Sequence, residues 1–209
     1  MRREKWFVSL LICVLAMCFM SVTAFAADTA KVAEVNGKQY DTLAGALAEA
    51  KASDTVKLLT DVTESVEITQ DITLNLGGHT LTSPSTAGNA VVIVNSDVII
   101  EDGNLTGGLR CVVEIKSGTQ QQLTLKGVTV TSANGAGGIW DFGTKSSVTL
   151  TDCDVSGDWF AITHNGKTAG FTLTATNSTF TAIEGSVPGA AAIYVSGNYT
   201  NTAEDMHGM

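Results

Sequence analysis

The sequence of 209 residues is short of basic residues, of aromatic residues and of proline. Lysine and arginine number 12 against 21 aspartates and glutamates, so the formal net charge is −9 at pH 7. Nucleic-acid-binding proteins carry basic surfaces, so DNA and RNA are not predicted as partners. Aromatic residues make up only 6% of the chain, so we expect an aliphatic core. Two prolines beside 21 glycines exclude a collagen helix and a proline-rich linker.

Cysteine is scarce as well, with four residues in the chain. Two of them fall in the N-terminal leader described next, which leaves Cys111 and Cys153. Two cysteines in an exported chain suggest a disulfide. The repeats described below, however, place these two on different strands and two coils apart. We therefore expect two buried thiols.

The N-terminus has the features of an export signal. Three basic residues among the first five precede an apolar run over residues 6–22, and the small-residue motif Ala-Phe-Ala ends at Ala26. This order predicts a signal peptide over residues 1–26 and a protein that is secreted or held at the cell surface. The alternative is an uncleaved membrane anchor, because the apolar run is close to the shortest that can span a bilayer.

Residues 27–53 predict a small cap. Asn36-Gly37 separates two short β-prone runs, which is typical of a tight β-hairpin. Residues 42–51 follow with apolar side chains on one helical face, and either Asp41 or Thr42 can serve as the N-cap. We expect this hairpin and helix to cover the first coil of the domain that follows.

Residues 54–209 are repetitive. A short β-prone segment recurs every 24 or 25 residues, beginning at Leu74, Val98, Leu123, Val148 and Leu173. The residue seven positions later is apolar in every unit (Leu81, Leu105, Val130, Val155 and Phe180), and the next one is Thr or Ser. A fixed period with fixed columns predicts a solenoid, and the alternation of apolar and polar residues predicts β-strands. The fold class is therefore all-β, a parallel β-helix of about 25 residues per coil. An antiparallel sandwich is the alternative.

A second strand is expected to close each coil. We align segments that begin at Val92, Val113, Trp140, Ile162 and Ile193. Their distance from the first strand varies, so one turn must differ in length between coils. No amphipathic cap follows the last of these segments, which predicts a β-helix that is truncated or uncapped at its C-terminus.

Three segments, residues 40–47, 54–62 and 72–81, carry a resemblance to a known family. They read Tyr-Asp-Thr-Leu-Ala-Gly-Ala-Leu, Asp-Thr-Val-Lys-Leu-Leu-Thr-Asp-Val and Ile-Thr-Leu-Asn-Leu-Gly-Gly-His-Thr-Leu. This pattern resembles the opening of bacterial right-handed parallel β-helix proteins of the pectin lyase-like superfamily. The superfamily includes polysaccharide lyases and hydrolases as well as non-catalytic surface proteins and adhesins. The resemblance therefore implies a fold without choosing a function.

The enzyme motifs of that superfamily have no match in the chain. Polygalacturonase-like members carry Asn-Thr-Asp, Asp-Asp, Gly-His-Gly and Arg-Ile-Lys, whereas this chain offers only Gly78-His79-Thr80. The calcium-binding acidic cluster of pectate lyase-like members is not matched either. These departures favour a non-catalytic protein.

Glu114 and Asp141 are the first candidate pair for chemistry. In the alignment above they occupy one outward column on consecutive coils, which places two carboxylates about 5 Å apart. Such a pair can share a proton, bind Ca²⁺, or act as acid and nucleophile on a sugar. The alternative is a solvated acidic surface.

Asp152, Asp154 and Asp158 lie close in sequence to Trp159. Carboxylates hydrogen-bond sugar hydroxyls while an indole stacks on the ring, so this group is a candidate sugar subsite. The alternative is a polar turn with Trp159 folded over a coil edge. His164 falls in an inward column and is predicted to be a hydrogen-bonded core residue. No spacing of His, Cys and acidic residues predicts a metal site.

Thr129 and Thr131 belong to a ladder of hydroxyl side chains that is expected to face outward. Similar Thr-x-Thr segments occur at residues 80–82 and 179–181. A regular threonine array resembles the ice-binding surface of some β-helical antifreeze proteins. The same flat surface suits weak contacts with glycans or proteins.

Taken together, these features predict an exported, non-catalytic β-helix surface protein of adhesin-like character. Its expected partner is an extracellular polysaccharide or a surface protein, and only the signal segment is expected to meet the membrane. A polysaccharide lyase or glycoside hydrolase, or a remnant of one, is the alternative, and an ice-binding threonine surface is a minor one. No cofactor is predicted, although Ca²⁺ remains open.

Overall fold

The computed structural model describes residues 30–84, 90–118, 120–132, 135–165, 170–183 and 190–195. The predicted signal peptide, residues 1–26, and residues 196–209 lie outside this part of the chain. None of the helices in the described ranges is long and apolar enough to cross a membrane.

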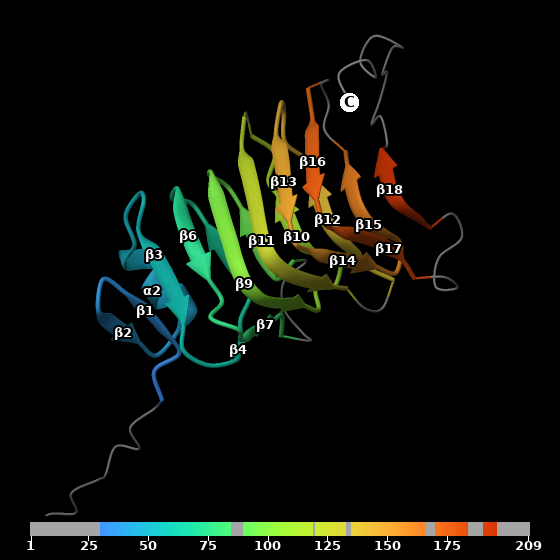
Figure 1. Cartoon of the computed structure of the whole chain (residues 1–209). Coiled ribbons are helices and arrows are strands. Elements are labelled where there is room, and N and C mark those ends of the chain that lie inside the picture. Colours follow the sequence, from blue (N-terminus) through green and yellow to red (C-terminus); the bar gives the residue numbers. More distant parts are fainter. Residues whose placement is uncertain are drawn as a thin grey trace, which may run out of the picture. The chain divides into compact units, whose positions relative to one another are not determined.

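The described chain forms a parallel β-solenoid, as expected (Figure 1). In the larger sheet the strands follow the order β16-β13-β11-β9-β6-β3-β1-β2. Four further strands belong to this sheet but lie off that order: β7 pairs with β4 and β9, and β14 pairs with β11 and β17. These strands are β1 Ala33–Val35, β2 Lys38–Tyr40, β3 Thr55–Leu58, β4 Val62–Thr63, β6 Ile72–Asn75, β7 Thr80–Thr82, β9 Val98–Thr106, β11 Gln122–Thr131, β13 Ser147–Thr151, β14 Asp154–Gly157, β16 Thr172–Thr176 and β17 Thr179–Ala182.

The smaller sheet lies across the solenoid from the larger one and has the order β18-β15-β12-β10-β8-β5. Its strands are β5 Val66–Ile68, β8 Val92–Val94, β10 Cys111–Ile115, β12 Gly137–Asp141, β15 Phe160–His164 and β18 Ala191–Val195. All neighbours in this sheet are parallel. The chain therefore alternates between the two sheets, and each coil stacks on the one before it.

The predicted hairpin and helix close the N-terminal end. Strands β1 and β2 pair antiparallel, and the turn between them uses positive φ at Asn36 and Gly37. Helix α2, Leu43–Glu49, begins after Thr42, whose hydroxyl accepts a hydrogen bond from the Gly45 N–H at 3.0 Å. Because β1 also pairs with β3, the hairpin covers the first edge of the larger sheet.

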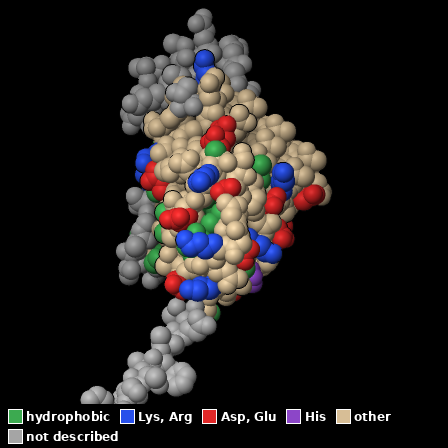
Figure 2. Space-filling model, turned by 90° about the vertical axis from the view of Figure 1, so that its left-hand side faces the viewer, with side chains coloured by type: hydrophobic (Ala, Val, Ile, Leu, Met, Phe, Trp, Pro, Cys, Tyr) green, Lys and Arg blue, Asp and Glu red, His purple; other side chains and the backbone are tan. Residues whose placement is uncertain are grey.

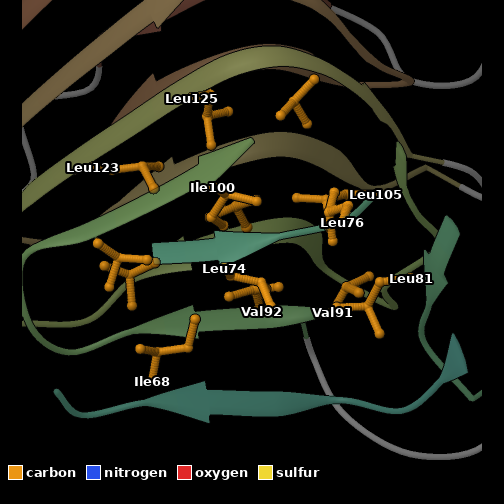
Figure 3. Packing of buried hydrophobic residues seen from close by; sticks show 14 of the residues in the cluster. Ile68, Leu74, Leu76, Leu81, Val91, Val92, Ile100, Leu105, Leu123 and Leu125 are labelled. Atoms are coloured by element: carbon orange, nitrogen blue, oxygen red, sulfur yellow. The ribbon is translucent and has the colours of Figure 1, made fainter. Parts of the chain in front are cut away.

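The core consists of aliphatic side chains stacked coil on coil between the two sheets. Leu74, Ile100 and Leu125 are fully buried in one column, and Leu81 and Leu105 are fully buried in another. Figure 3 shows these residues pointing into the same interior space. Each such side chain contributes about 1.5–3 kcal/mol through burial. The expectation of an aliphatic core is confirmed.

The repeat alignment is right for four units and wrong by two residues in the first. Ile72, not Leu74, lies opposite Val98. The Leu81–Leu105 pairing agrees with the alignment, so the first unit has two extra residues between its strands. The turn over residues 76–79 absorbs them, with φ of +61° at Gly77 and +79° at Gly78. Glycine adopts this left-handed conformation without steric cost.

The second-strand alignment is wrong by one residue in the third unit. Val113 pairs with Ile139, and Ile139 pairs with Ile162, so Trp140 does not occupy the inward column. The turns before these strands vary in length, so their register cannot be counted along the sequence. An alignment that places the apolar residues inward therefore puts Trp140 where the structure has Ile139. A one-residue shift reverses the direction of every side chain.

Candidate functional site

Aromatic side chains gather on the outer face of the smaller sheet. Trp140 on β12 lies edge-on to Trp159, with ring centroids 5.8 Å apart and an interplanar angle of 86°. Trp159 in turn lies 6.4 Å from Tyr194 on β18, at 32°. Tyr194 is 40% exposed, and the two tryptophans are half-buried. Three successive coils therefore supply one ring or more to a single surface.

An ion pair on the preceding coil extends this surface. The guanidinium carbon of Arg110 lies 5.0 Å from the centroid of Trp140 and 5.1 Å from that of Phe142. Arg110 is also paired with Glu114, four residues later. Cation–π contacts and a carboxylate partner hold the guanidinium in place. We call the set Arg110, Glu114, Trp140, Phe142, Trp159 and Tyr194 the aromatic face.

The aromatic face rests on a close-packed base. The Phe160 ring is buried 5.3 Å from Trp140 and 5.2 Å from Trp159. Gly137 leaves the space that this ring fills, because a Cβ atom there would lie 2.0 Å from the Phe160 ring. The glycine is thus required by packing. The rings of Trp140 and Trp159 therefore pack on a buried side chain.

The expected Glu114–Asp141 pair is not formed. Glu114 lies opposite Trp140, whereas Asp141 lies opposite Ile115. The one-residue error described above turns Asp141 into the interior, where it is fully buried, while Glu114 stays on the outer face with Arg110. The prediction that the two carboxylates stack is therefore wrong, and the arrangement that suggested Ca²⁺ is absent.

Asp141 is instead the acceptor of a buried polar network. Its Oδ2 atom accepts hydrogen bonds from the Ser146 hydroxyl at 2.5 Å and from His164 Nδ1 at 2.6 Å. Its Oδ1 atom accepts the Gly143 N–H at 2.8 Å. The imidazole also stacks on Phe171, with centroids 4.7 Å apart. His164 is thus a hydrogen-bonded core residue, as predicted from its column.

The acidic residues near Trp159 do not form one group. Asp158 is almost fully buried and accepts the Gly135 N–H at 2.7 Å. Asp152 lies in the turn between β13 and β14 of the larger sheet and accepts a hydrogen bond from Asn177. Trp159, by contrast, packs on Trp140 of the smaller sheet. Of the predicted subsite, Trp159 alone belongs to the aromatic face.

The threonine ladder has the expected geometry. Thr129 and Thr131 are exposed on the outer face of the larger sheet. The register places them in two columns that continue over five successive coils. The columns are Thr80, Asn104, Thr129, Asp154 and Thr179, and Thr82, Thr106, Thr131, Ser156 and Thr181. The structure therefore offers a second regular surface, on the larger sheet rather than on the smaller one, whose role stays a prediction.

Four residues of the aromatic face are not among the candidates that the sequence predicts, namely Arg110, Trp140, Phe142 and Tyr194. The sequence alignment puts Trp140 in an inward column, because it is apolar and lies near the expected strand start. The signal that could have corrected this is the pair Gly137-Gly138 before it, since two glycines break the alternation on which the alignment relied.

The search for related proteins gave no relative. No protein-family model, no curated protein and no solved structure matches this chain. The fold is thus identified from its own strand register as a parallel β-solenoid. Within the described ranges, no group of three or more His, Cys, Asp or Glu side chains is placed to hold a metal ion.

Cys111 lies fully buried next to Arg110, and Cys153 is buried as well. Neither forms a disulfide, as predicted. Burial raises the pKa of the Cys111 thiol to about 12, and the Glu114 carboxylate adds to this effect. Because the thiolate is the nucleophile, the reactivity of this cysteine is suppressed at neutral pH.

We expect Cys111 to resist alkylation in the native protein. At pH 8 about one thiol in ten thousand is ionised at this pKa, so iodoacetamide should label Cys111 only after denaturation. Mass spectrometry of peptides from native and urea-treated protein measures this. Labelling of Cys111 in the native protein at the rate of a free thiol would show that the base of the aromatic face opens to solvent.

Proposed function

We propose that this protein is an exported, non-catalytic glycan-binding β-solenoid, and that the aromatic face holds the glycan. The observation that carries the proposal is the row of Trp140, Trp159 and Tyr194 on successive coils, beside the Arg110–Glu114 pair. Indole and phenol rings stack on the apolar faces of sugar rings. The guanidinium and carboxylate groups hydrogen-bond sugar hydroxyls.

Two sequence features support the glycan class. The leader over residues 1–26 predicts export, which would bring the solenoid into contact with extracellular polysaccharides. The resemblance of residues 40–81 to the pectin lyase-like superfamily points to proteins that act on or bind polysaccharides. Both remain proposals for this chain.

The positions of the carboxylates favour binding over catalysis. Glycoside hydrolysis uses two carboxyl groups that flank one sugar bond. Here Asp141 is enclosed in the core and Glu114 is paired with Arg110. We therefore retain the polysaccharide lyase or hydrolase only as an alternative, and the ice-binding surface of Thr129 and Thr131 as a minor one.

A glycan array followed by calorimetry with the best ligand tests the proposal. We expect Trp159→Ala to weaken binding at least about tenfold, because aromatic side chains at the centre of an interface dominate affinity. The matched control is Thr131→Ala on the other sheet, which should leave the affinity unchanged. Chemical unfolding of each variant checks that its fold is intact.

Three results would contradict this proposal. Equal affinity in the wild type and Trp159→Ala would exclude the aromatic face. A loss of affinity in Thr131→Ala instead would place the site on the threonine ladder. Release of reducing ends or unsaturated products from any polysaccharide would make the protein an enzyme.

A further inference from the structure

The aromatic face continues into a charged stretch of the same outer surface. Strand register aligns one column on the outer side of the smaller sheet, from β5 to β18. Its members are Glu67, Ile93, Glu114, Trp140, Thr163 and Tyr194. Glu114 and Trp140 are direct neighbours in this column, on strands about 4.8 Å apart. A ligand that stacks on the rings therefore lies next to carboxylates.

The basic side chains that flank this column each have a carboxylate partner. The six strands of the smaller sheet, all within the described ranges, contain no Lys or Arg. The basic residues directly next to them are Arg110 and Lys116, on either side of β10. Arg110 is paired with Glu114, and the Lys116 ammonium group donates a hydrogen bond to Glu67 Oε1 at 2.8 Å. Each of the two positive charges is thus balanced by a negative one.

The Glu67–Lys116 pair stays ionised at neutral pH. The hydrogen bond from Lys116 lowers the pKa of the Glu67 carboxyl, and a hydrogen bond from Asn95 at 3.0 Å adds to this effect. The carboxylate is therefore present wherever the ammonium group is present, and Lys116 does not offer an unbalanced positive charge to a ligand.

The charge of the whole chain acts in the same direction. The formal net charge is −9, and Lys and Arg side chains are interspersed with Asp and Glu over the end of the molecule that bears α2 (Figure 2). A polyanion that approaches the aromatic face meets a repulsive field. A hydroxyl group, by contrast, both donates and accepts hydrogen bonds, so it can bind a guanidinium and a carboxylate at once.

We propose that the aromatic face binds an uncharged glycan chain and discriminates against acidic polysaccharides, above all those built from uronic acids. The inference rests on the proposed function and narrows its class of ligand. The rings pack on the apolar faces of the sugars, while the Arg110–Glu114 pair binds their hydroxyl groups. A uronate carboxylate in the same place meets the Glu114 carboxylate, and like charges across an interface oppose binding.

Calorimetry with hexasaccharides of equal length tests this choice of ligand. The uncharged probes are cellohexaose, xylohexaose and mannohexaose, and the acidic probe is hexagalacturonate. We expect the best uncharged probe to bind at least about tenfold more tightly than hexagalacturonate at low ionic strength, where charge repulsion is strongest. The affinity for the uncharged probe should change little when salt is added.

Glu114→Gln removes the carboxylate that balances Arg110 and keeps the size of the side chain. We expect hexagalacturonate to bind this variant at least about fivefold more tightly than the wild type, because the guanidinium is then free to pair with a uronate. Added salt should reduce the gain. Glu67→Gln frees Lys116 in the same way, and it decides the matter if Glu114→Gln does not fold by circular dichroism.

Glu101→Gln is the matched control, because it removes the same charge from the outer face of the larger sheet, where Glu101 accepts a hydrogen bond from Asn75. It should change the affinity for hexagalacturonate less than about twofold. An equal gain in Glu101→Gln and Glu114→Gln would overturn the inference, since the ion pair would not set the selectivity. An unchanged affinity in both Glu114→Gln and Glu67→Gln would overturn it too.

Two further outcomes separate this inference from the proposed function. If hexagalacturonate binds the wild type more tightly than every uncharged probe and Trp159→Ala abolishes that binding, the aromatic face remains a glycan site but its uncharged ligand is wrong. If neither the hexasaccharides nor the glycan array shows binding, both the site and its ligand class are wrong.

Discussion

Asp141→Ala is expected to lower the free energy of unfolding by about 3–5 kcal/mol, the cost of removing one partner from a buried polar pair. The carboxylate accepts hydrogen bonds from Ser146, His164 and the Gly143 N–H inside the solenoid. Alanine leaves these three donors, which lie inside the solenoid, without their acceptor. Urea denaturation followed by circular dichroism measures the change.

Asp154→Ala is the control for this prediction. Asp154 is an exposed carboxylate on the outer face of the larger sheet, where it accepts a hydrogen bond from Thr179. Asp154→Ala should change the free energy of unfolding by no more than about 0.5 kcal/mol, as for most surface substitutions. If Asp141→Ala were no more destabilising than Asp154→Ala, Asp141 would not lie in the core, and the register of β12 would have to be revised.

Gly157→Ala is expected to destabilise the protein by about 3 kcal/mol or more, at the upper end of the range for overpacked cores. A Cβ atom at Gly157 would lie 1.9 Å from the Phe160 carbonyl oxygen and 2.7 Å from the Gly138 nitrogen. Both are backbone atoms, so no side-chain rotation relieves the clash. The larger and smaller sheets would have to separate at this turn. Thermal unfolding of the variant measures the loss.

Gly127→Ala is the control that distinguishes the effect of close packing on stability from the effect of backbone conformation. Gly127 has φ of +59°, and a Cβ atom there would meet nothing within 4 Å. Its replacement should lower the free energy of unfolding by about 1–2 kcal/mol, because alanine is unfavourable in the left-handed conformation. A Gly157→Ala variant as stable as Gly127→Ala would contradict the close approach of β14 to β12 and β15.

The sequence predicted the stacking of coils because the inward columns are almost wholly aliphatic. The column that includes Leu81, Leu105 and Val130 needed no correction, because its apolar residues recur every 24 or 25 residues, although the turn before Leu81 is two residues longer than in the next coil. The hairpin and helix at the N-terminus were also predicted, because their local signals at Asn36-Gly37 and Thr42 act within a few residues.

The site was harder to predict because it depends on register between distant strands. Trp159 was identified from its residue type, but its partner Trp140 was placed inward. The error has one physical source. A polar residue, Asp141, occupies the interior column, and its hydrogen bonds to Ser146 and His164 depend on a turn and on the next coil. Neither contact is visible in the alternation of a single strand.

The two outer surfaces differ in what they offer a ligand. The threonine ladder presents small polar side chains, mostly hydroxyls, on the outer face of the larger sheet. The aromatic face presents rings with a charged pair at its edge, on a base held by Phe160 and Gly137. Rigid aromatic side chains give more contact area for less entropy lost. This difference is the reason for placing the glycan on the smaller sheet.

Tryptophan fluorescence during titration with the best glycan from the array tests this placement most directly. The chain has three tryptophans, of which Trp6 falls in the predicted signal peptide and the other two belong to the aromatic face. We predict a saturable change in emission with the same affinity as calorimetry, and no release of sugar products. Calorimetric binding without any change in emission, or the appearance of product, would contradict the account.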